Sequence, residues 1–144
     1  MIETTAPGKV ILFGEHAVVY GQPAIAIPVS RLRTRVVITE NTPFPTLNLP
    51  DLSTAVDITA VSEREEEPLL AAVREVQTYL GLIQFPAICL TLTSDIPIAS
   101  GLGSGAAAAC ALIRSLLSYF GQDAPNEVVN KLVYNVEKLY HRPP

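Results

Sequence analysis

One stretch of the sequence decides how the rest is interpreted: Pro97-Ile98-Ala99-Ser100-Gly101-Leu102-Gly103-Ser104-Gly105-Ala106. An apolar run that ends at Thr93 precedes it and an alanine-rich run follows it, which predicts a strand, a glycine loop and a helix. Glycines at alternate positions allow left-handed backbone angles and leave no Cβ in the way of a ligand. The free N–H groups that begin the helix attract an anion, and Ser100 and Ser104 add hydroxyl donors. We therefore expect residues 97–106 to bind phosphate.

Two other kinds of glycine loop fit less well. No lysine follows the glycines, so the loop is not of the G-x-x-x-x-G-K-[ST] type. Gly101, Gly103 and Ala106 match the dinucleotide pattern G-x-G-x-x-A, but that site also needs an acidic residue at the end of a second parallel strand. Asp123 has the right distance and lies between two predicted helices instead. The structural alternative is a glycine-rich turn that only begins a tightly packed helix.

A second informative stretch is PGKVILFGEHAVVYG, residues 7–21. Lys9, Glu15 and His16 are polar residues in apolar sequence, where a buried charge is costly unless it is paired. Lys9 is expected to pair with a carboxylate or to reach a phosphate, unless it simply extends into solvent. Glu15 and His16 are candidates to contact a polar substrate at the end of a strand, and the alternative is an ordinary turn.

The remaining pattern predicts an α+β domain in the order strands, helix, strand, helix, helix. The acidic run 63–67 is interpreted as the solvated start of the first helix, which Gly81 ends. Alternation of apolar residues with Arg31, Arg33 and Arg35 indicates a strand with one wet face. The expected strands are 9–13, 24–28, 32–38, an edge strand at 47–49, and 85–93. The expected helices are 68–80, 106–120 and 126–141.

Composition excludes several classes of protein. A chain of 144 residues, 49% hydrophobic and 17% charged, is one folded domain and not a disordered one. A net charge of −4 argues against general nucleic-acid binding. No apolar run reaches the roughly 18 residues of a membrane span, and the N-terminus lacks the basic start of a signal peptide. Cys89 and Cys110 are expected to be buried, reduced thiols, so we predict a cytoplasmic protein without nucleic-acid or membrane partners.

The two glycine-containing stretches together resemble the GHMP kinase superfamily. Residues 7–21 resemble its first motif, and PIASGLGSGAAAA, residues 97–109, resembles its second. Within the superfamily, residues 8–21 and Leu47-Asn48-Leu49-Pro50 are most similar to the mevalonate kinase branch. The resemblance covers residues 1–144 and corresponds to the N-terminal, ATP-binding half of that family. It implies a mixed sheet with helices packed on it, similar to ribosomal protein S5 domain 2, and a C-terminal domain absent from this chain.

The resemblance also implies roles for particular residues. Pro97 to Ala106 would wrap the ATP phosphates, and Lys9 would lie near the transferred phosphoryl group and the substrate hydroxyl. Glu15 and His16 would lie on the mevalonate side of the cleft, and Glu137 would hold Mg²⁺, although without the family it is interpreted as an exposed helix residue. Many relatives read GLGSS, and their last serine is a magnesium ligand. Gly105 stands at that position here, so Ser104 or water would supply the oxygen.

The sequence ends where the family continues. His141-Arg142-Pro143-Pro144 resembles the start of a P-S-G-x-D stretch whose aspartate is catalytic. The resemblance therefore implies ATP-dependent phosphorylation of mevalonate by the complete protein, in the isoprenoid pathway, and an inactive chain by itself. Phosphomevalonate or another small alcohol is the alternative acceptor, and a non-catalytic nucleotide-binding module is the alternative of another class. A cleft left open exposes apolar surface, which predicts association into a homodimer.

Overall fold

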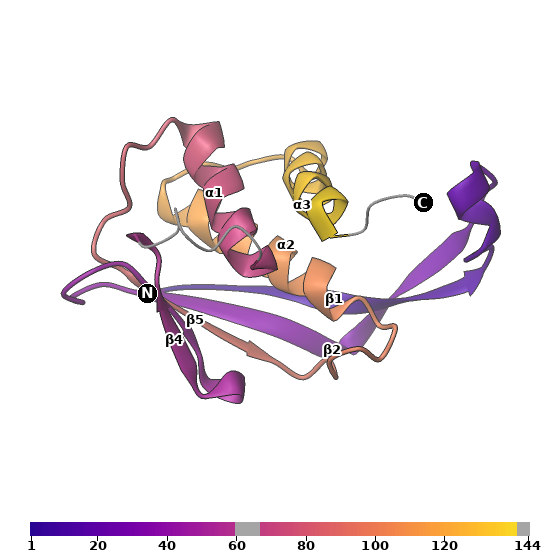
Figure 1. The fold of residues 1–144 in the computed structure, drawn as a ribbon, viewed down its shortest axis with the longest axis horizontal. Helices are drawn as coiled ribbons and strands as arrows, with labels where there is room; N and C mark the ends of the chain where they lie inside the picture. The colour runs from indigo at the N-terminus through magenta and orange to yellow at the C-terminus, as the bar shows by residue number, and fades with distance from the viewer. Residues whose placement is uncertain (60–66, 141–144) are drawn as a thin grey trace.

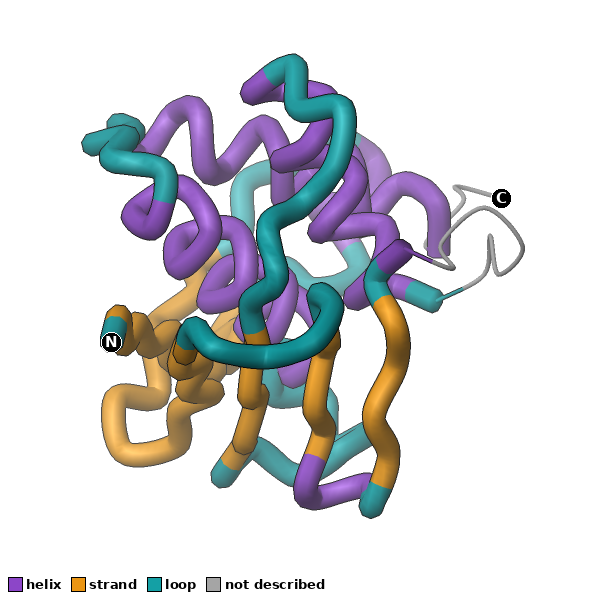
Figure 2. Tube along the Cα trace, turned by 90° about the vertical axis from the view of Figure 1, so that its left-hand side faces the viewer, coloured by secondary structure: helices purple, strands orange, loops and turns teal. Residues whose placement is uncertain are grey.

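The computed structural model describes residues 1–59 and 67–140, and these form two layers. A five-stranded sheet makes one layer, and the three long helices lie together on one of its faces (Figure 1; Figure 2). The helices are α1 (Pro68–Leu80), α2 (Ser104–Tyr119) and α3 (Asn126–Tyr140). This arrangement confirms the predicted α+β class with helices packed on a mixed sheet.

The sheet has the strand order β1-β2-β5-β3-β4. Its strands are β1 (Ile2–Phe13), β2 (Ile25–Thr39), β3 (Thr46–Leu49), β4 (Thr54–Asp57) and β5 (Cys89–Ser94). β5 runs parallel to β3 and antiparallel to β2, whereas β1 with β2 and β3 with β4 are antiparallel pairs. The carboxyl end of β5 therefore lies inside the sheet, beside β2, and delivers the chain into the glycine loop.

Helix α2 forms the centre of the core. Its residues are apolar nearly all round, and it packs against β1, β2, α1 and α3. The buried serine on this helix satisfies its own hydroxyl, because Ser115 Oγ donates to Leu112 O at 2.8 Å. Thr4 Oγ1 donates to Ala111 O at 2.8 Å and ties β1 to the same helix. A fixed α2 holds the glycine loop, which joins its N-terminus, in a defined place.

β1 and β2 form a long hairpin that extends beyond the helices (Figure 1). Its tip carries a short 3-10 helix, η1 (Ala17–Tyr20). Large apolar side chains are exposed along it, with Phe13 71% and Tyr20 83% accessible. Ile25 and Ile27 are exposed as well, so the run 24–28 is a strand but not a buried one. Sequence alone could not show this, because burial depends on how far the hairpin reaches past the body.

Several predicted boundaries were wrong. The runs 24–28 and 32–38 belong to one strand, because both pair with β1 across an irregularity between Pro7 and Gly8. The run 47–49 is not an edge strand, since β3 lies between β5 and β4, and β4 was not predicted. The strand predicted for 85–93 begins only at Cys89. Helix α2 begins two residues before the predicted start, which places Ser104 and Gly105 in its first turn.

The helix predictions otherwise match. α1 begins at Pro68 after Glu67 and ends at Gly81, which has the left-handed conformation expected of a C-terminal cap. Most of the acidic run 63–67 lies outside the described residues. Within the part of the chain that the structure describes, the helices are too short or too polar to cross a membrane.

Candidate active site

Residues 95–103 connect the end of β5 to the start of α2, so the glycine loop, residues 97–106, comprises most of this connection and the first turn of α2. Gly101 and Gly103 have φ of 75° and 71°, in the left-handed region that favours glycine. Ala99 has φ of 57°, which is a strained conformation for a residue with a side chain. Ser100 Oγ donates to Pro97 O at 2.7 Å and closes the turn. The loop therefore has a defined backbone conformation, which includes one residue other than glycine at positive φ.

The N-terminus of α2 is open to a ligand. Gly103 is its N-cap and makes no side-chain hydrogen bond to the first turn. The N–H groups of Ser104, Gly105 and Ala106 have no acceptor inside the helix, because the first turn of any α-helix lacks them. A Cβ placed on Gly101 would meet no described atom within 4 Å. The exposed loop and the helix dipole together favour an anion here.

The first motif lies directly against this loop. The backbone N–H of Lys9 donates to Leu102 O at 2.9 Å. A Cβ on Gly8 would lie 3.0 Å from the same carbonyl oxygen, so any larger residue would press the loop backbone away from β1. The Lys9 side chain crosses Gly103, since Cγ and Cε lie 3.1 Å from where a Cβ on Gly103 would be. The segments PGK, residues 7–9, and GLG, residues 101–103, are therefore in contact although they are 94 positions apart in the sequence.

Helix α3 brings a carboxylate to the same helix N-terminus. Glu137 Oε1 lies 4.0 Å from the position of a Cβ on Gly105. Glu137 is half-buried, so it is not the fully exposed helix residue that its sequence context alone suggested. The positive end of the α2 dipole stabilises the carboxylate. No group of three or more His, Cys, Asp or Glu side chains among the described residues is arranged to hold a metal ion.

Two cavities flank the start of α2. One, of about 350 Å³, is lined mainly by apolar side chains and reaches Ser104 and Gly105. Its other lining residues come from β3 and the turn after it, β5, the loop, the N-terminal end of α1, and α2: Leu49, Asp51, Leu52, Glu67, Pro68, Leu69, Leu92, Ser94, Ile96, Ile98 and Ala108. The second, of about 330 Å³, lies on the side of β1 and α3 and includes Lys9, Gly103 and Asn130. A ligand held at the helix N-terminus could therefore extend to either side.

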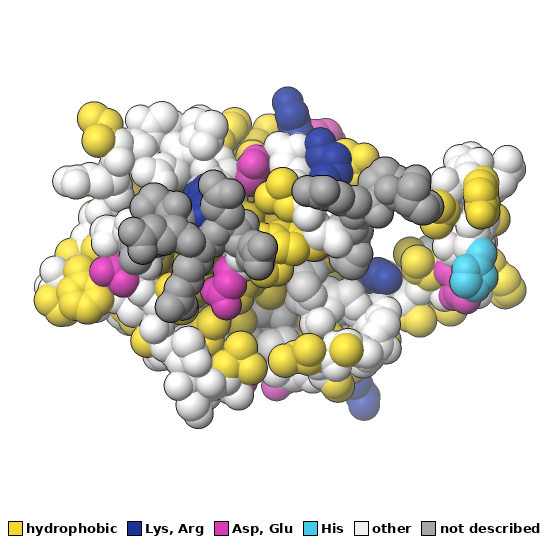
Figure 3. All heavy atoms as spheres, in the orientation of Figure 1, with side chains coloured by type: hydrophobic (Ala, Val, Ile, Leu, Met, Phe, Trp, Pro, Cys, Tyr) yellow, Lys and Arg dark blue, Asp and Glu magenta, His cyan; other side chains and the backbone are white. Residues whose placement is uncertain are grey.

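Glu15 and His16 lie elsewhere, at the tip of the β1–β2 hairpin. Their side chains are close, with Glu15 Oε1 and His16 Nε2 3.5 Å apart, but His16 is 96% exposed. Such an exposed pair contributes little to stability. Figure 3 shows the acidic and histidine side chains at the end of the hairpin, apart from the helical part of the molecule. The structure thus joins Lys9 and Glu137 to the glycine loop and leaves Glu15 and His16 at a distance from it.

The dinucleotide alternative does not fit the topology. Asp123 lies in the connection between α2 and α3, not at the end of a strand. The chain also passes from α2 to α3 without an intervening strand in the segment 104–140, which the structure describes throughout.

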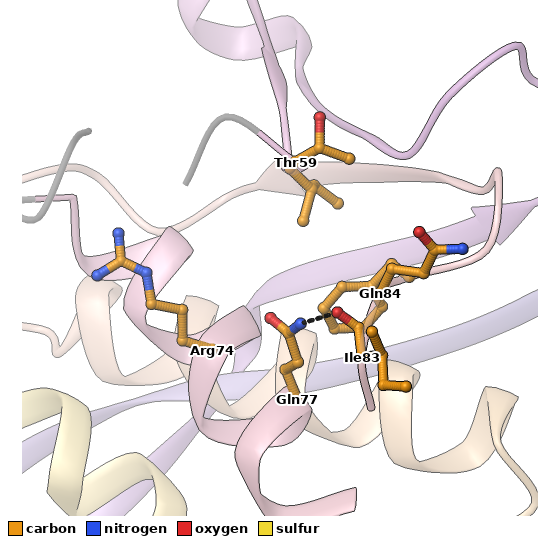
Figure 4. A pocket seen from close by; sticks show the side chains of 7 residues that line it. Thr59, Arg74, Gln77, Ile83 and Gln84 are labelled. Carbon is orange, nitrogen blue, oxygen red and sulfur yellow. Dashed lines mark hydrogen bonds between the residues drawn. The ribbon is translucent and has the colours of Figure 1, made fainter. Parts of the chain in front are cut away.

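Another cavity, of about 370 Å³, lies away from the glycine loop (Figure 4). It is lined by the C-terminal half of α1 and the chain around Ile83. Gln77 Nε2 donates to the carbonyl oxygens of Leu82 and Ile83, both at 3.2 Å. These bonds occupy the Gln77 amide, and among the described lining residues Arg74 is the cationic one. It shares no residue with the loop site.

Comparison with known proteins decides the family. Residues 67–143, more than half of the chain, match the family described as GHMP kinases N terminal domain. The chain belongs to the GHMP kinase family. The match includes both the glycine loop and Glu137 of this GHMP kinase domain, and it confirms the superfamily that the motifs indicated.

This GHMP kinase chain is similar to mevalonate kinases. It is 32% identical to the mevalonate kinase of Methanocaldococcus jannaschii, over 96% of this chain and 46% of that relative. A crystal structure of the Methanococcus jannaschii mevalonate kinase superposes with a TM-score of 0.85 at 29% identity, covering 97% of this chain and 47% of that one. Streptococcus pneumoniae phosphomevalonate kinase shares the fold, with a TM-score of 0.78 at 17% identity over 94% of this chain and 42% of its own. The chain spans about half the length of the relatives it matches.

Sequence reasoning missed the apolar cavity beside Gly105. Its lining comes from segments that are far apart in the sequence, at 49–52, 67–69, 92–98 and 104–108, so no local pattern could reveal it. The sequence offered one hint of this cavity, the short motif at residues 47–50. In the structure it is followed by Asp51, whose Oδ2 accepts a hydrogen bond from the backbone N–H of Ser94 at 2.8 Å. That bond ties the turn after β3 to the last residue of β5, directly before the glycine loop.

Proposed function

We propose that this chain is the nucleotide-binding part of an enzyme that transfers the γ-phosphoryl group of ATP to the primary hydroxyl of mevalonate. One observation supports the proposal: the aliphatic stem of the exposed Lys9 side chain lies across Gly103, so its ammonium group is within reach of a helix N-terminus that favours an anion. The similarity to mevalonate kinases supports the choice of acceptor.

The chain's own groups provide positioning and charge neutralisation, which dominate phosphoryl transfer. Residues 97–106 hold the phosphates through the backbone N–H groups and the dipole of α2. The Lys9 ammonium stabilises the negative charge that develops between the phosphate and the attacking oxygen. A lysine suits this task as a compact point charge on a flexible stem.

Magnesium has a physical reason to bind here. A phosphate and the Glu137 carboxylate at one helix N-terminus repel each other unless a cation lies between them. Glu137, Ser104 and water would hold Mg²⁺, which neutralises phosphate charge when bound. Gly105 adds no ligand, so the carboxylate is the principal one that this chain supplies.

The two cavities suggest how the ligands are divided. The apolar cavity beside Ser104 and Gly105 has the size and lining for an adenine ring. The cavity on the Lys9 side would receive the acceptor alcohol. Glu15 and His16 would bind the polar end of mevalonate only after the space between the hairpin tip and the loop is closed.

The chain alone is proposed to bind nucleotide weakly and to have almost no kinase activity. It would form the N-terminal part of a protein about twice as long, in which the P-S-G-x-D stretch would supply the catalytic aspartate and a C-terminal domain would close over the substrate. A general base contributes roughly 10²–10⁴-fold, and exclusion of water by a closing domain adds to that.

The test is nucleotide binding by the 144-residue chain, measured by calorimetry with ATP and with Mg-ATP. We expect affinity in both titrations, tighter with magnesium, and at least a tenfold loss of affinity in Lys9→Met. Equal affinity of Lys9→Met and the parent chain would overturn the role of Lys9. Absence of any nucleotide binding would overturn the whole proposal.

Measurement of kinase turnover distinguishes mevalonate from the alternative acceptor and from a non-catalytic module. Phosphorylation is measured with the 144-residue chain and with a full-length protein that contains it. We expect no turnover by the first and preference for mevalonate over phosphomevalonate by the second. A preference for phosphomevalonate would establish the alternative acceptor, and nucleotide binding without turnover by the full-length protein would establish a non-catalytic module.

A further inference from the structure

The face of the sheet opposite the helices carries a row of arginines. On β2, Thr34 and Val36 are buried under α2, so Arg33 and Arg35 point to the other face. They line a cavity of about 390 Å³ together with Arg31, Thr5, Thr93 and Asp95. None of the described helices covers this face (Figure 1; Figure 2). The cavity shares no residue with the glycine loop site.

The arginines are held in different ways. Arg33 Nε donates to Thr5 Oγ1 at 3.0 Å and one Nη donates to Ser30 O at 3.4 Å, which fixes the guanidinium and leaves its second Nη for a ligand. Arg35 pairs with Glu3 at 3.0 Å, but both side chains are about half exposed. Within the described residues, Arg31 has no hydrogen-bonding or ion-pair partner. At least two of the three guanidinium groups can therefore receive an anion.

Hydroxyl groups flank the cations in register. Thr5 pairs with Arg35 across β1 and β2, and Arg35 pairs with Thr93 across β2 and β5, so the three side chains form one row. Guanidinium groups bind phosphate in bidentate fashion, and threonine hydroxyls add donors. Alternate residues on a strand are about 6.6–6.8 Å apart, which suits a ligand with two linked phosphates better than a single one.

Electrostatics also favours an anion. Three of the ten Lys and Arg side chains of a chain with net charge −4 lie in succession on one strand face. Guanidinium groups at such short distances repel one another, and a bound anion removes this repulsion. Asp95 limits the effect, because its carboxylate lines the same cavity while its backbone N–H donates to Arg33 O at 3.0 Å.

We propose that this arginine cavity, lined by Thr5, Arg31, Arg33, Arg35, Thr93 and Asp95, is a second anion site that binds a small soluble molecule containing a diphosphate group. The site is independent of the proposed nucleotide site. It lies on the opposite face of the sheet and uses guanidinium groups in place of a helix N-terminus.

The test uses inorganic pyrophosphate as the probe and the whole 144-residue chain. Binding is measured by calorimetry, and amide resonances are followed by NMR. We expect the amides of Thr5 and Thr93 to shift, in addition to any shifts of the glycine loop. Orthophosphate should bind at least tenfold more weakly, and equal affinity would overturn the diphosphate class.

Three variants make the test specific. Arg31→Gln removes an exposed side chain without structural contacts and should weaken pyrophosphate binding about tenfold. Asp95→Asn keeps the backbone bond to Arg33 and should tighten binding several-fold. Lys131→Gln, an exposed residue on α3, makes the same charge change as Arg31→Gln and should have no effect.

Several outcomes would overturn the proposal. These are shifts confined to residues 97–106, equal effects of Arg31→Gln and Lys131→Gln, and binding to phosphatidylserine vesicles without binding to pyrophosphate. The last result would identify a membrane surface in place of a small molecule. Loss of nucleotide binding with retention of these shifts would leave the proposal standing and would reject only the proposed function.

Discussion

At the scale of single residues, Gly101 and Gly103 allow a controlled comparison of two glycine-to-alanine substitutions. Both have left-handed backbone angles, but only a side chain on Gly103 would collide with Lys9. We expect Gly101→Ala to lower the free energy of unfolding by about 1–2 kcal/mol through backbone strain alone. Gly103→Ala should cost about 2–3 kcal/mol and should also displace Lys9, weakening nucleotide binding. Urea denaturation and calorimetry measure both, and equal effects of the two variants would contradict the contact with Lys9.

Gly105 offers a prediction about the metal. Gly105→Ser would place a hydroxyl near Glu137 Oε1, where the resemblance to GLGSS relatives implies a ligand. We expect tighter binding of Mg-ATP than in the parent chain and no change for ATP without magnesium. The control is Gly105→Ala, which should stabilise α2 by roughly 1 kcal/mol without adding a ligand. An equal gain of Mg-ATP affinity in both variants would mean that helix stability, not the hydroxyl, is responsible.

Tyr119 determines part of the alkaline stability. Burial, and then its hydrogen bond to Glu40 at 3.0 Å and the nearby carboxylate charge, raise the pKa of Tyr119 above the usual 10. The folded state therefore favours the protonated phenol. This contribution to stability is complete below pH 10 and is lost as the pH rises through the higher pKa of the folded state. Thermal unfolding at pH 8 to 11 should show a steeper alkaline decline for the parent chain than for Tyr119→Phe.

The site residues differed in how far sequence could predict them. The residue types and spacing within 97–106 and 7–21 predict a phosphate site there, and this stays a prediction. The contact between Lys9 and Gly103 could not be predicted from the sequence, because it depends on how two segments that are distant in the chain meet in the fold. Glu137 required the family resemblance, since a single glutamate on an amphipathic helix has no local signal. The arginines of β2 were predicted on a wet strand face, but a cavity there was not predicted.

At the scale of elements, α2 is the helix at the centre of the core, against which the sheet and the other two helices pack. Leu112 is fully buried at its centre, among side chains of the sheet and of the neighbouring helices. Leu112→Ala should lower the free energy of unfolding by about 2–5 kcal/mol, because it leaves a cavity that the core cannot fill. The matched control is Leu139→Ala on α3, an exposed leucine whose loss should cost under about 0.5 kcal/mol. Similar midpoints in urea for both variants would contradict the central position of α2.

Elements with strong periodicity were predictable and the short strands were not. Helices α1, α2 and α3 have apolar spacing over four turns or so, and Gly81 and Pro125 mark their limits. β4 has only four residues, Thr54 to Asp57, which is too short for a recognisable alternation. The position of β3 inside the sheet follows from its parallel pairing with β5, a long-range contact that prolines at 43, 45 and 50 gave no reason to expect.

At the scale of the whole molecule, several large apolar side chains are exposed together on the hairpin, which favours association. Phe13, Val19 and Tyr20 lie at or near its tip, with Ile25 opposite. We expect the 144-residue chain to associate through this hairpin, which light scattering and sedimentation at increasing concentration will detect. Phe13→Ser/Tyr20→Ser should shift the distribution toward the monomer. Ile83→Ser, at a residue 97% exposed on the main body, should not.

The hydrogen bond between Lys9 and Leu102 has a mechanical consequence. β1 continues from the core to Phe13, with irregularities in its pairing with β2 after Pro7 and after Ile11, and Glu15 follows two residues later. The strand that leads to the hairpin tip therefore meets the glycine loop at Gly8 and Lys9, through the backbone bond to Leu102 and the Lys9 side chain over Gly103. A ligand that displaced the hairpin at its tip would also act on the glycine loop at this contact.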